Sequence, residues 1–165
     1  MNEVTFPVAL GLGSNIGDRY AALRGAIEGL RPYIAIDALS PAYETAPAYV
    51  TDQPRFLNAA LTGTTKLAPF ALLRLVKDLE SSLGRQPSFR NGPRMIDIDI
   101  LFYGDETVHI PELTIPHASM AERDFVLCPL NDIAPQWRHP GTGATVAEMF
   151  ARLAENSAVR MDEAL

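Results

Sequence analysis

Apolar and polar positions follow two different periods in the first part of the chain. Residues 4–12 are a nearly continuous apolar run, which predicts a buried strand. A glycine-rich turn at residues 11–18 follows, and the next segment has apolar residues at the spacing of a helix, namely Leu23, Ile27 and Leu30. The pattern predicts a strand, a tight turn and an amphipathic helix, in that order.

Two further strands and a second helix are predicted downstream. Apolar residues favour strands at about residues 34–43 and 57–65, and a proline-containing loop at 45–56 separates them. One helix face is formed by residues spaced 4, 3 and 4 apart, which are Leu72, Val76, Leu79 and Leu83. Gly84 stands directly after them, where a glycine commonly ends a helix.

The order of these elements predicts the fold class. Residues 85–94 contain two prolines, three arginines and no acid, which predicts a loop, and the alternating, β-branched residues 95–103 predict a half-buried strand. The resulting order is βαββαβ, an α+β ferredoxin-like core with helices on one face of an antiparallel sheet. The remainder from Gly104 is expected to be a C-terminal appendage with a helix near 146–153. Residues 1–165 would then form a single domain.

Composition narrows the possible functions. The 165 residues carry 14 basic and 20 acidic side chains, a formal net charge of −6, and 47% of the residues are hydrophobic. This balance is typical of a folded globular protein and argues against nucleic acid or an anionic membrane as partner, because both bind through an excess of Lys and Arg. However, 12 of the 14 basic residues are Arg, whose planar guanidinium makes bidentate contacts with phosphate. A local phosphate site remains open despite the acidic total.

The single cysteine and the N-terminus bear on localisation. Cys128 lies in the apolar run 125–130, so an internal disulfide and a cysteine-based zinc site are excluded and a buried thiol is expected. The N-terminal residues lack the basic start and apolar stretch of a signal peptide, and no run has the length of a membrane span. A reducing, cytoplasmic location is the resulting expectation.

The sharpest chemical feature is the acidic pair Asp97 and Asp99 in the predicted strand. Residues two apart in a strand face the same side, with about 7 Å between them. A solvated sheet face would account for them, although two like charges side by side repel each other. Carboxylates at this spacing also suit Mg²⁺, which takes one or two carboxylates together with water and substrate phosphates. Both interpretations stay open on these residues alone.

An arginine-rich loop leads directly into the acidic pair, with Arg94 three residues before Asp97. Weak surface ion pairs, worth about 0–1 kcal/mol each, would account for any single arginine. For the set, a polyphosphate with its metal would satisfy both signs of charge, which is the grouping found in phosphoryl transfer.

Other candidate residues carry weaker local signals. The common nucleotide motifs GxGxxG and GxxxxGK[ST] do not occur. Gly13-Ser14-Asn15 locally favours a turn and a helix cap. His117 precedes Arg123 by six residues, and it is either structural or able to bind phosphate or transfer a proton.

Four motifs occur in order along almost the whole chain. They are Gly11-Leu12-Gly13-Ser14-Asn15, Asp52-Gln53-Pro54-Arg55-Phe56-Leu57-Asn58-Ala59-Ala60, Gly92-Pro93-Arg94-Met95-Ile96-Asp97-Ile98-Asp99-Ile100 and Pro116-His117. Together they resemble the 6-hydroxymethyl-7,8-dihydropterin pyrophosphokinase family of folate biosynthesis. The resemblance implies transfer of the β,γ-pyrophosphoryl group of ATP to the pterin hydroxymethyl oxygen, with release of AMP and with two Mg²⁺ ions as cofactors.

The same resemblance implies roles for particular residues. Asp97 and Asp99 would hold the metal ions and, with Arg85 and Arg94, make up the catalytic set. ATP would be bound by Glu80, Arg85, Arg94, Ile100, Thr114, His117 and Arg123. The pterin would be bound by Thr45, Ala46, Ala48, Phe56, Asn58 and Phe125. In this last set the two phenylalanine rings would stack on the heterocycle, while amide groups would read its edge.

Two other functions share parts of this pattern. The βαββαβ order also belongs to RNA-recognition modules, but these need aromatic residues on the central strands and a basic surface. The Ile-Asp-Ile-Asp-Ile strand and the negative net charge argue against such a module. A regulatory domain that binds a nucleotide without turnover is harder to exclude from residues. The expected partners are small molecules, with no nucleic acid and no membrane, and the expected state is a monomer.

Overall fold

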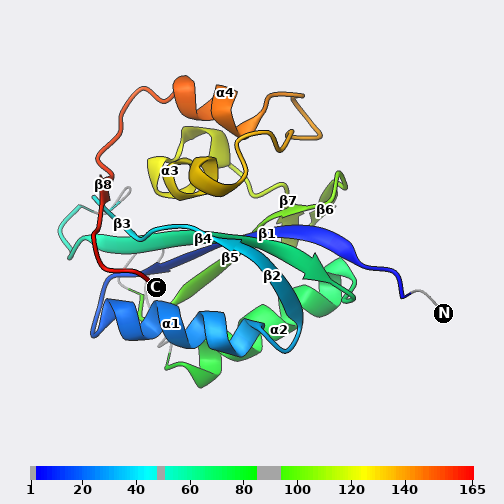
Figure 1. Cartoon of the computed structure of the whole chain (residues 1–165), viewed down its shortest axis with the longest axis horizontal. Helices are drawn as coiled ribbons and strands as arrows, with labels where there is room; N and C mark the ends of the chain where they lie inside the picture. The colour runs from blue at the N-terminus through cyan, green and yellow to red at the C-terminus, as the bar shows by residue number, and fades with distance from the viewer. Residues whose placement is uncertain (1–2, 48–50, 85–93) are drawn as a thin grey trace.

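An antiparallel sheet runs through the middle of the molecule (Figure 1). The computed structural model describes residues 3–47, 51–84 and 94–165. Within these residues the sheet has six strands, which are β1 (Phe6–Ser14), β2 (Ile34–Leu39), β3 (Tyr43–Thr45), β4 (Phe56–Thr65), β5 (Asp97–Tyr103) and β8 (Val159–Arg160). Strand β1 lies between β5 and β4, and β4 pairs with both β2 and β3. Residues on β1 therefore have strand neighbours on both sides.

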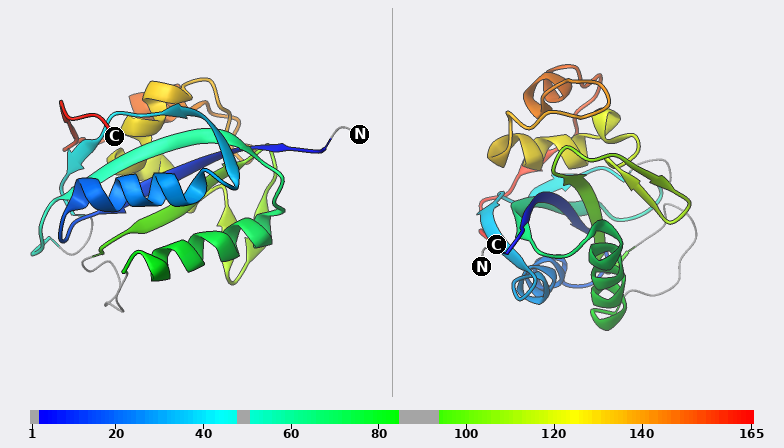
Figure 2. Two further views of the ribbon diagram at one scale, coloured as in Figure 1. Left: turned by 60° about the horizontal axis from the view of Figure 1, so that its bottom comes forward. Right: turned by 90° about the vertical axis from the view of Figure 1, so that its right-hand side faces the viewer.

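Helices cover both faces of this sheet (Figures 1 and 2). One face packs against α1 (Arg19–Leu30) and α2 (Pro69–Ser82), and the other against α3 (Asp124–Ile133) and α4 (Val146–Ala151). The shorter elements are the hairpin of β6 (Val108–Ile110) and β7 (Leu113–Ile115) and the 3₁₀ helix η1 (Met120–Glu122). The two helices of the predicted core, α1 and α2, share one face as expected, and the C-terminal part supplies the helices that bury the second face. None of the helices in the described residues is long and apolar enough to span a membrane.

The helix ends follow local capping chemistry. Helix α1 begins after Asp18, whose side chain accepts a hydrogen bond from the N–H of Ala21 at 3.0 Å. Helix α2 begins at Pro69, which lacks the N–H that a first-turn residue would leave unpaired. Gly84 follows the last turn of α2 with a φ of +94°, so the predicted end of this helix is confirmed.

The predicted strand 34–43 is two strands, β2 and β3, rather than one. Pro41 lies between them and has no N–H to donate across the sheet. Ser40 bridges this point, because its N–H donates to the carbonyl of Ala60 and its hydroxyl accepts from the N–H of Ala60, both at 2.9 Å. Strand β3 is consequently a short, separate strand.

Helix α3 is absent from the elements that the sequence predicts. It contains Pro129 in its interior, a residue that usually breaks a helix. Val126, Leu127 and Leu130 are at most 4% exposed, and they pack against the second face of the sheet. Tertiary packing thus stabilises a helix that local propensity disfavours. Cys128 is buried as predicted, and burial raises the pKa of its thiol to about 11.

Candidate active site

The acidic pair lies at the beginning of β5, beside the central strand β1. Ile98 is 3% exposed, whereas Asp97 and Asp99 are half-buried on the opposite face, as the alternation predicts. The side chain of Asp99 is 31% exposed and so can reach a ligand. In the register with β1, Asp97 is opposite Gly13 and Asp99 is opposite Gly11. Glycines therefore face both carboxylates on the central strand.

Negative charge is concentrated around Asp99. Burial, followed by the carboxylates of Asp97 and Glu80, raises the pKa of Asp99 to about 8, and Arg123 and Lys77 partly oppose this rise. These neighbouring negative charges disfavour ionisation of Asp99. A cation between the carboxylates would relieve the repulsion.

The carboxylates of this site suit Mg²⁺ better than they suit a metal ion whose ligands all come from the protein. In the part of the chain that the structure describes, no three or more His, Cys, Asp or Glu side chains converge in a way that could hold a metal ion. Mg²⁺ does not need such a cage, because it binds through one or two carboxylates and keeps water and substrate phosphate as its other ligands. Two carboxylates on one face, such as Asp97 and Asp99, are what this ion takes.

Glu80 connects α2 to the strand that carries the acidic pair. Its side chain is 2% exposed, and its Oε2 accepts a hydrogen bond from the N–H of Ile98 at 3.0 Å. Its other carboxylate oxygen lies 3.4 Å from Lys77 Nζ. These contacts explain an acid in the last turn of a helix, where the helix dipole disfavours negative charge. Glu80 holds the start of β5 against α2.

His117 and Arg123 lie beside the acidic pair. His117 Nε2 is 3.6 Å from Asp99 Oδ1, which is longer than a hydrogen bond. Burial and the nearby Arg123 guanidinium lower the pKa of His117, which favours the neutral imidazole. The N–H of His117 donates to the carbonyl of Leu101 at 3.1 Å, so the segment after β7 is tied to β5.

Two other residues predicted to contact ATP have different surroundings. Ile100 is 4% exposed and belongs to the core cluster shared with α1 and α2, so a ligand on the opposite face can meet only its backbone. Thr114 is half-buried on β7, opposite His109 of β6. Thr114 is thus carried by the hairpin and not by the main sheet.

The buried amide of Asn58 lies across β1 from the acidic pair. Gly13 is opposite Asp97 on one side and Asn58 on the other, so about 10 Å separates the outer two backbones. Asn58 is 4% exposed and donates from Nδ2 to the hydroxyl of Thr45 at 2.6 Å. A Cβ at position 13 would lie 2.8 Å from Asn58 Oδ1. The amide oxygen of Asn58 therefore occupies the space that a side chain at Gly13 would need.

The two predicted stacking rings come from different elements near this amide. Phe56 begins β4, and Phe125 lies in the first turn of α3, which packs against β3 and β4. The Arg123 guanidinium is 5.4 Å from the centre of the Phe125 ring, within the range of a cation–π contact. Arg123, which is predicted to contact ATP phosphates, therefore lies against Phe125, which is predicted to stack on the pterin.

The segment at Thr45 and Ala46 already uses several polar groups. The N–H of Ala46 donates to the hydroxyl of Ser157 at 3.0 Å, and the Thr45 hydroxyl accepts from Asn58. The N–H of Ala46 and the hydroxyl of Thr45 are therefore already hydrogen-bonded within the protein. Ala48 and Arg85, which the resemblance also assigns to the site, lie outside the described residues.

Asn15 joins three segments at one end of the sheet, a role that its local sequence does not indicate. It is 2% exposed, and its amide donates to Gln53 Oε1 and to the carbonyl of Pro54, each at 3.0 Å. Its Oδ1 accepts from the N–H of Arg94 at 2.8 Å, and its own N–H donates to the Arg94 carbonyl at 3.0 Å. The expectation of a helix cap is wrong, since Asp18 caps α1. Asn15 instead sets the position of Arg94 relative to β1.

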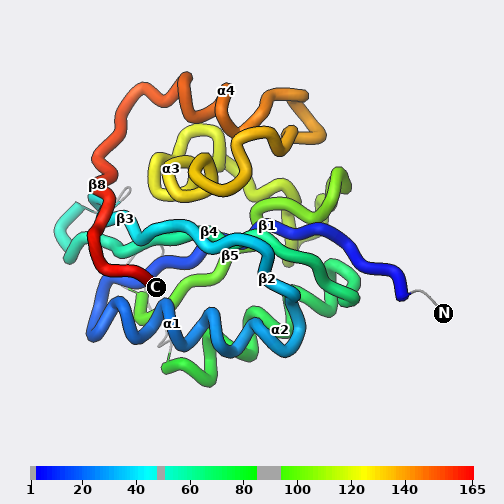
Figure 3. The backbone as a smooth tube through the Cα atoms, in the orientation of Figure 1, coloured from blue at the N-terminus to red at the C-terminus, as the bar shows by residue number. Residues whose placement is uncertain are grey.

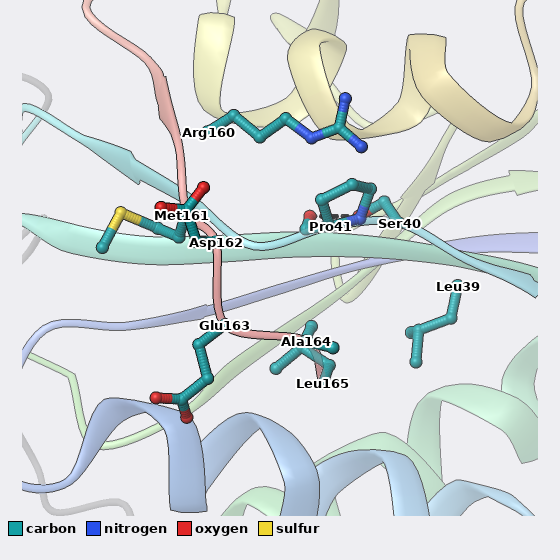
Figure 4. Close-up of a pocket in the computed structure, with 9 residues that line it drawn as sticks. All are labelled: Leu39, Ser40, Pro41, Arg160, Met161, Asp162, Glu163, Ala164 and Leu165. Atoms are coloured by element: carbon teal, nitrogen blue, oxygen red, sulfur yellow. Dashed lines mark hydrogen bonds between the residues drawn. The ribbon is translucent and has the colours of Figure 1, made fainter.

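A cavity of about 470 Å³ lies elsewhere, between the C-terminal residues 160–165 and the β2–β3 connection (Figure 4). Leu39, Ser40 and Pro41 complete its lining, and the side chain of Arg160 extends along it. None of the described site residues lines this cavity.

Two carboxylates beside a histidine and an arginine are an arrangement typical of phosphoryl-transfer enzymes. Phosphoryl-transfer enzymes hold a metal–nucleotide complex with carboxylates and neutralise phosphate charge with cationic side chains. Over residues 9–135 the chain matches the family model described as 7,8-dihydro-6-hydroxymethylpterin-pyrophosphokinase, HPPK. The chain belongs to this family.

Curated relatives extend the similarity beyond that range. A 2-amino-4-hydroxy-6-hydroxymethyldihydropteridine pyrophosphokinase of Methylorubrum extorquens is 45% identical over 155 residues, covering 93% of this chain and 97% of the relative. The protein of the same name in Bacillus subtilis is 42% identical, covering 93% and 91%. A mitochondrial folate synthesis bifunctional protein of Arabidopsis thaliana is 43% identical over 94% of this chain, which spans only 30% of that relative's length.

Solved structures share the fold. The crystal structure of Plasmodium falciparum HPPK-DHPS A437G with SDX-DHP superposes with a TM-score of 0.75 at 17% identity, covering 96% of this chain and 49% of that one. At this identity the likeness concerns the fold, a mixed α/β arrangement of an antiparallel sheet and helices.

Proposed function

We propose that the chain transfers the β,γ-pyrophosphoryl group of ATP to the hydroxymethyl oxygen of 6-hydroxymethyl-7,8-dihydropterin and releases AMP. The observation that carries this proposal is the row of Asp97, Gly13 and Asn58 on three adjacent strands. An acid able to hold a metal–nucleotide complex thus lies about 10 Å from an amide suited to the edge of a heterocycle. The glycine between them has no side chain to separate the two substrates.

On the nucleotide side, Asp97 and Asp99 would hold two Mg²⁺ ions. When bound, the ions would neutralise charge on the phosphate oxygens and lower the cost of ionising the attacking hydroxyl. Arg94 and Arg85 would assist the transferring group, and the remaining ATP contacts would come from Glu80, Ile100, Thr114, His117 and Arg123. The two hydrogen bonds between Asn15 and the Arg94 backbone support the role of Arg94, since they set the course of its backbone.

On the pterin side, Phe56 and Phe125 would stack on the two faces of the heterocycle. Asn58 and the backbone of Thr45, Ala46 and Ala48 would read its donor and acceptor groups. The bond from Asn58 Nδ2 to Thr45 fixes the amide, so its carbonyl oxygen is oriented before the substrate binds.

Several broader features complete the proposal. The strand order β5-β1-β4 with β2 beyond it supports a ferredoxin-like core, and the two buried clusters that share one sheet support a single domain. We further propose that the chain is a cytoplasmic monomer. It would act on small molecules and would bind neither nucleic acid nor a membrane. The helices on both sheet faces support this view, because an RNA-recognition module binds RNA on its sheet face.

Product analysis tests the proposed reaction. Purified chain incubated with ATP, MgCl₂ and the hydroxymethyl dihydropterin should form AMP and the diphosphorylated pterin in equal amounts, measured by chromatography and ³¹P NMR. Omitting the pterin should abolish AMP formation. Binding of ATP with no AMP in the complete mixture would instead indicate a regulatory nucleotide-binding domain, and ADP as the product would indicate a different transfer.

Gly13→Ala should weaken pterin binding selectively. The new Cβ would lie 2.8 Å from Asn58 Oδ1, so the amide must move away from its bond to Thr45. We expect the KM for pterin to rise by about tenfold, the usual effect of losing one or two polar contacts, with little change in the KM for ATP.

Gly11→Ala is the matched control on the same strand. A Cβ at position 11 would lie 3.5 Å from the Leu101 side chain, an ordinary van der Waals contact. Its KM for pterin should equal that of the wild type. Equal effects of the two substitutions on pterin would contradict the assignment of Asn58.

A further inference from the structure

The C-terminal strap, defined as residues 156–164, runs along the outer edge of the sheet beside β3 (Figure 3). Its strand β8 pairs with β3, and the N–H of Met161 donates to the carbonyl of Ala42 at 2.9 Å. The family match ends at residue 135, so the strap lies beyond it. The segment that follows β3 contains Ala46, whose backbone is proposed to recognise the edge of the pterin.

Within the strap, Ser157 hydrogen-bonds to three separate segments of the described chain. Its hydroxyl accepts from the N–H of Ala46 at 3.0 Å and donates to Asp124 Oδ2 at 3.0 Å. Its N–H donates to the same carboxylate oxygen at 2.7 Å, and its carbonyl accepts from the Arg55 guanidinium at 3.1 Å. Charge-assisted bonds of this kind are stronger than those between neutral groups.

Each of these segments adjoins the proposed pterin site. Ala46 belongs to the edge-reading backbone, Asp124 precedes Phe125, and Arg55 precedes Phe56. Ser157 therefore hydrogen-bonds to the residue that precedes each proposed stacking ring and to the edge-reading backbone at Ala46.

The strap is anchored independently of this serine. Arg24 of α1 donates to Glu163 Oε2 and to the carbonyl of Ala164, both at 2.8 Å. Met161 packs against the core cluster under the sheet. Because these contacts and the pairing of β8 hold the strap, the position of Ser157 does not depend on a bound ligand.

We propose that Ser157 is a positioning residue of the pterin site, which holds the backbone at Ala46 and the start of α3 at a fixed separation. This inference rests on the proposed function. Preorganised contacts strengthen binding because less ordering remains to be done when the ligand arrives. Asp97 and Asp99 lie on β5, on the far side of β1 and β4 from β3, and the bond from the Ser157 N–H to Asp124, next to Arg123, does not need the hydroxyl. The metal and nucleotide side should therefore be unaffected when the hydroxyl is removed.

Ser157→Ala in the full chain tests the proposal. We expect the KM for pterin to rise by about tenfold, with kcat and the KM for ATP within about twofold of wild type, because only contacts on the pterin side are lost. Hydrogen exchange of the Ala46 amide should become faster, since its acceptor is removed. Ser157→Thr keeps the hydroxyl, so its KM for pterin and its Ala46 exchange rate should match those of the wild type. Glu155→Ala, at an exposed position just before the strap, should leave both quantities unchanged.

The outcomes separate this inference from the proposed reaction. Wild-type protein that makes no AMP would overturn the proposed function, whatever the variants do. Active wild type with an unchanged pterin KM in Ser157→Ala would overturn the positioning role. If Ser157→Ala instead impairs kcat and both KM values to the same extent and lowers the melting temperature, Ser157 has a merely structural role. That result would also overturn the positioning role.

Discussion

Asp99→Asn is expected to lower kcat for AMP formation by about three orders of magnitude, because the proposed metal site would then keep only one of its two carboxylates. The substitution preserves the shape of the side chain and removes its charge. Steady-state kinetics over a range of MgCl₂ concentrations would measure the loss. Isothermal titration should show that the variant binds Mg²⁺–ATP more weakly than the wild type does.

The folded state should tolerate this change. Burial and the carboxylates of Asp97 and Glu80 raise the pKa of Asp99 to about 8, so its ionised form opposes folding. In metal-free protein, the stability linked to this group is fully present below the pKa of a free aspartate and is lost as the pH rises through about 8. Thermal unfolding across this range should show a smaller loss of stability for Asp99→Asn than for the wild type.

Asp105→Asn is the matched control, since Asp105 is exposed in the turn after the same strand. Its turnover and its response to Mg²⁺ should equal those of the wild type. An Asp99→Asn variant that unfolds, or one whose kcat stays within about tenfold of wild type, would contradict a metal-binding role for Asp99.

Asn15→Ala should reduce both activity and stability. We expect kcat to fall by about 100-fold, the effect of misplacing reacting groups by about 1 Å, because Arg94 loses its anchor to β1. The free energy of unfolding should fall by about 1–3 kcal/mol, since the buried partners of the amide are left without it. Kinetics and urea unfolding would measure the two effects.

Two further variants separate the parts of this network. Gln53→Ala removes one acceptor and should have a smaller effect than Asn15→Ala on both quantities. Asn15→Asp keeps the acceptor for the N–H of Arg94, but it cannot donate to Pro54 and it places a charge at a position that is 2% exposed. Its stability loss should be at least that of the alanine variant. Wild-type kinetics in Asn15→Ala would refute the anchoring role.

Local patterns predicted those features that depend on short-range geometry. The shared face of Asp97 and Asp99 follows from the period of a strand, and the end of α2 follows from the positive φ that Gly84 adopts. The division of the predicted strand at Pro41 could also have been found locally, from its missing N–H.

Contacts between distant segments could not be predicted in this way. The partners of Asn15 lie 38 to 79 positions away, and the N–H of Ile98 that Glu80 binds lies 18 positions along the chain. Helix α3 forms despite Pro129 because its apolar side chains pack against the second sheet face. The free energy gained by this packing outweighs the poor helix propensity of proline.

The sequence by itself determined the family resemblance, most of the core strands and helices, and the acidic pair, because these depend on residue identity and on spacing within a few positions. Only the tertiary structure decided that Asn58 lies across Gly13 from Asp97, and that Ser157 lies against the segment after β3. The physical reason is strand register: pairing brings residues from distant parts of the chain together, and the pattern within one strand does not specify its partners.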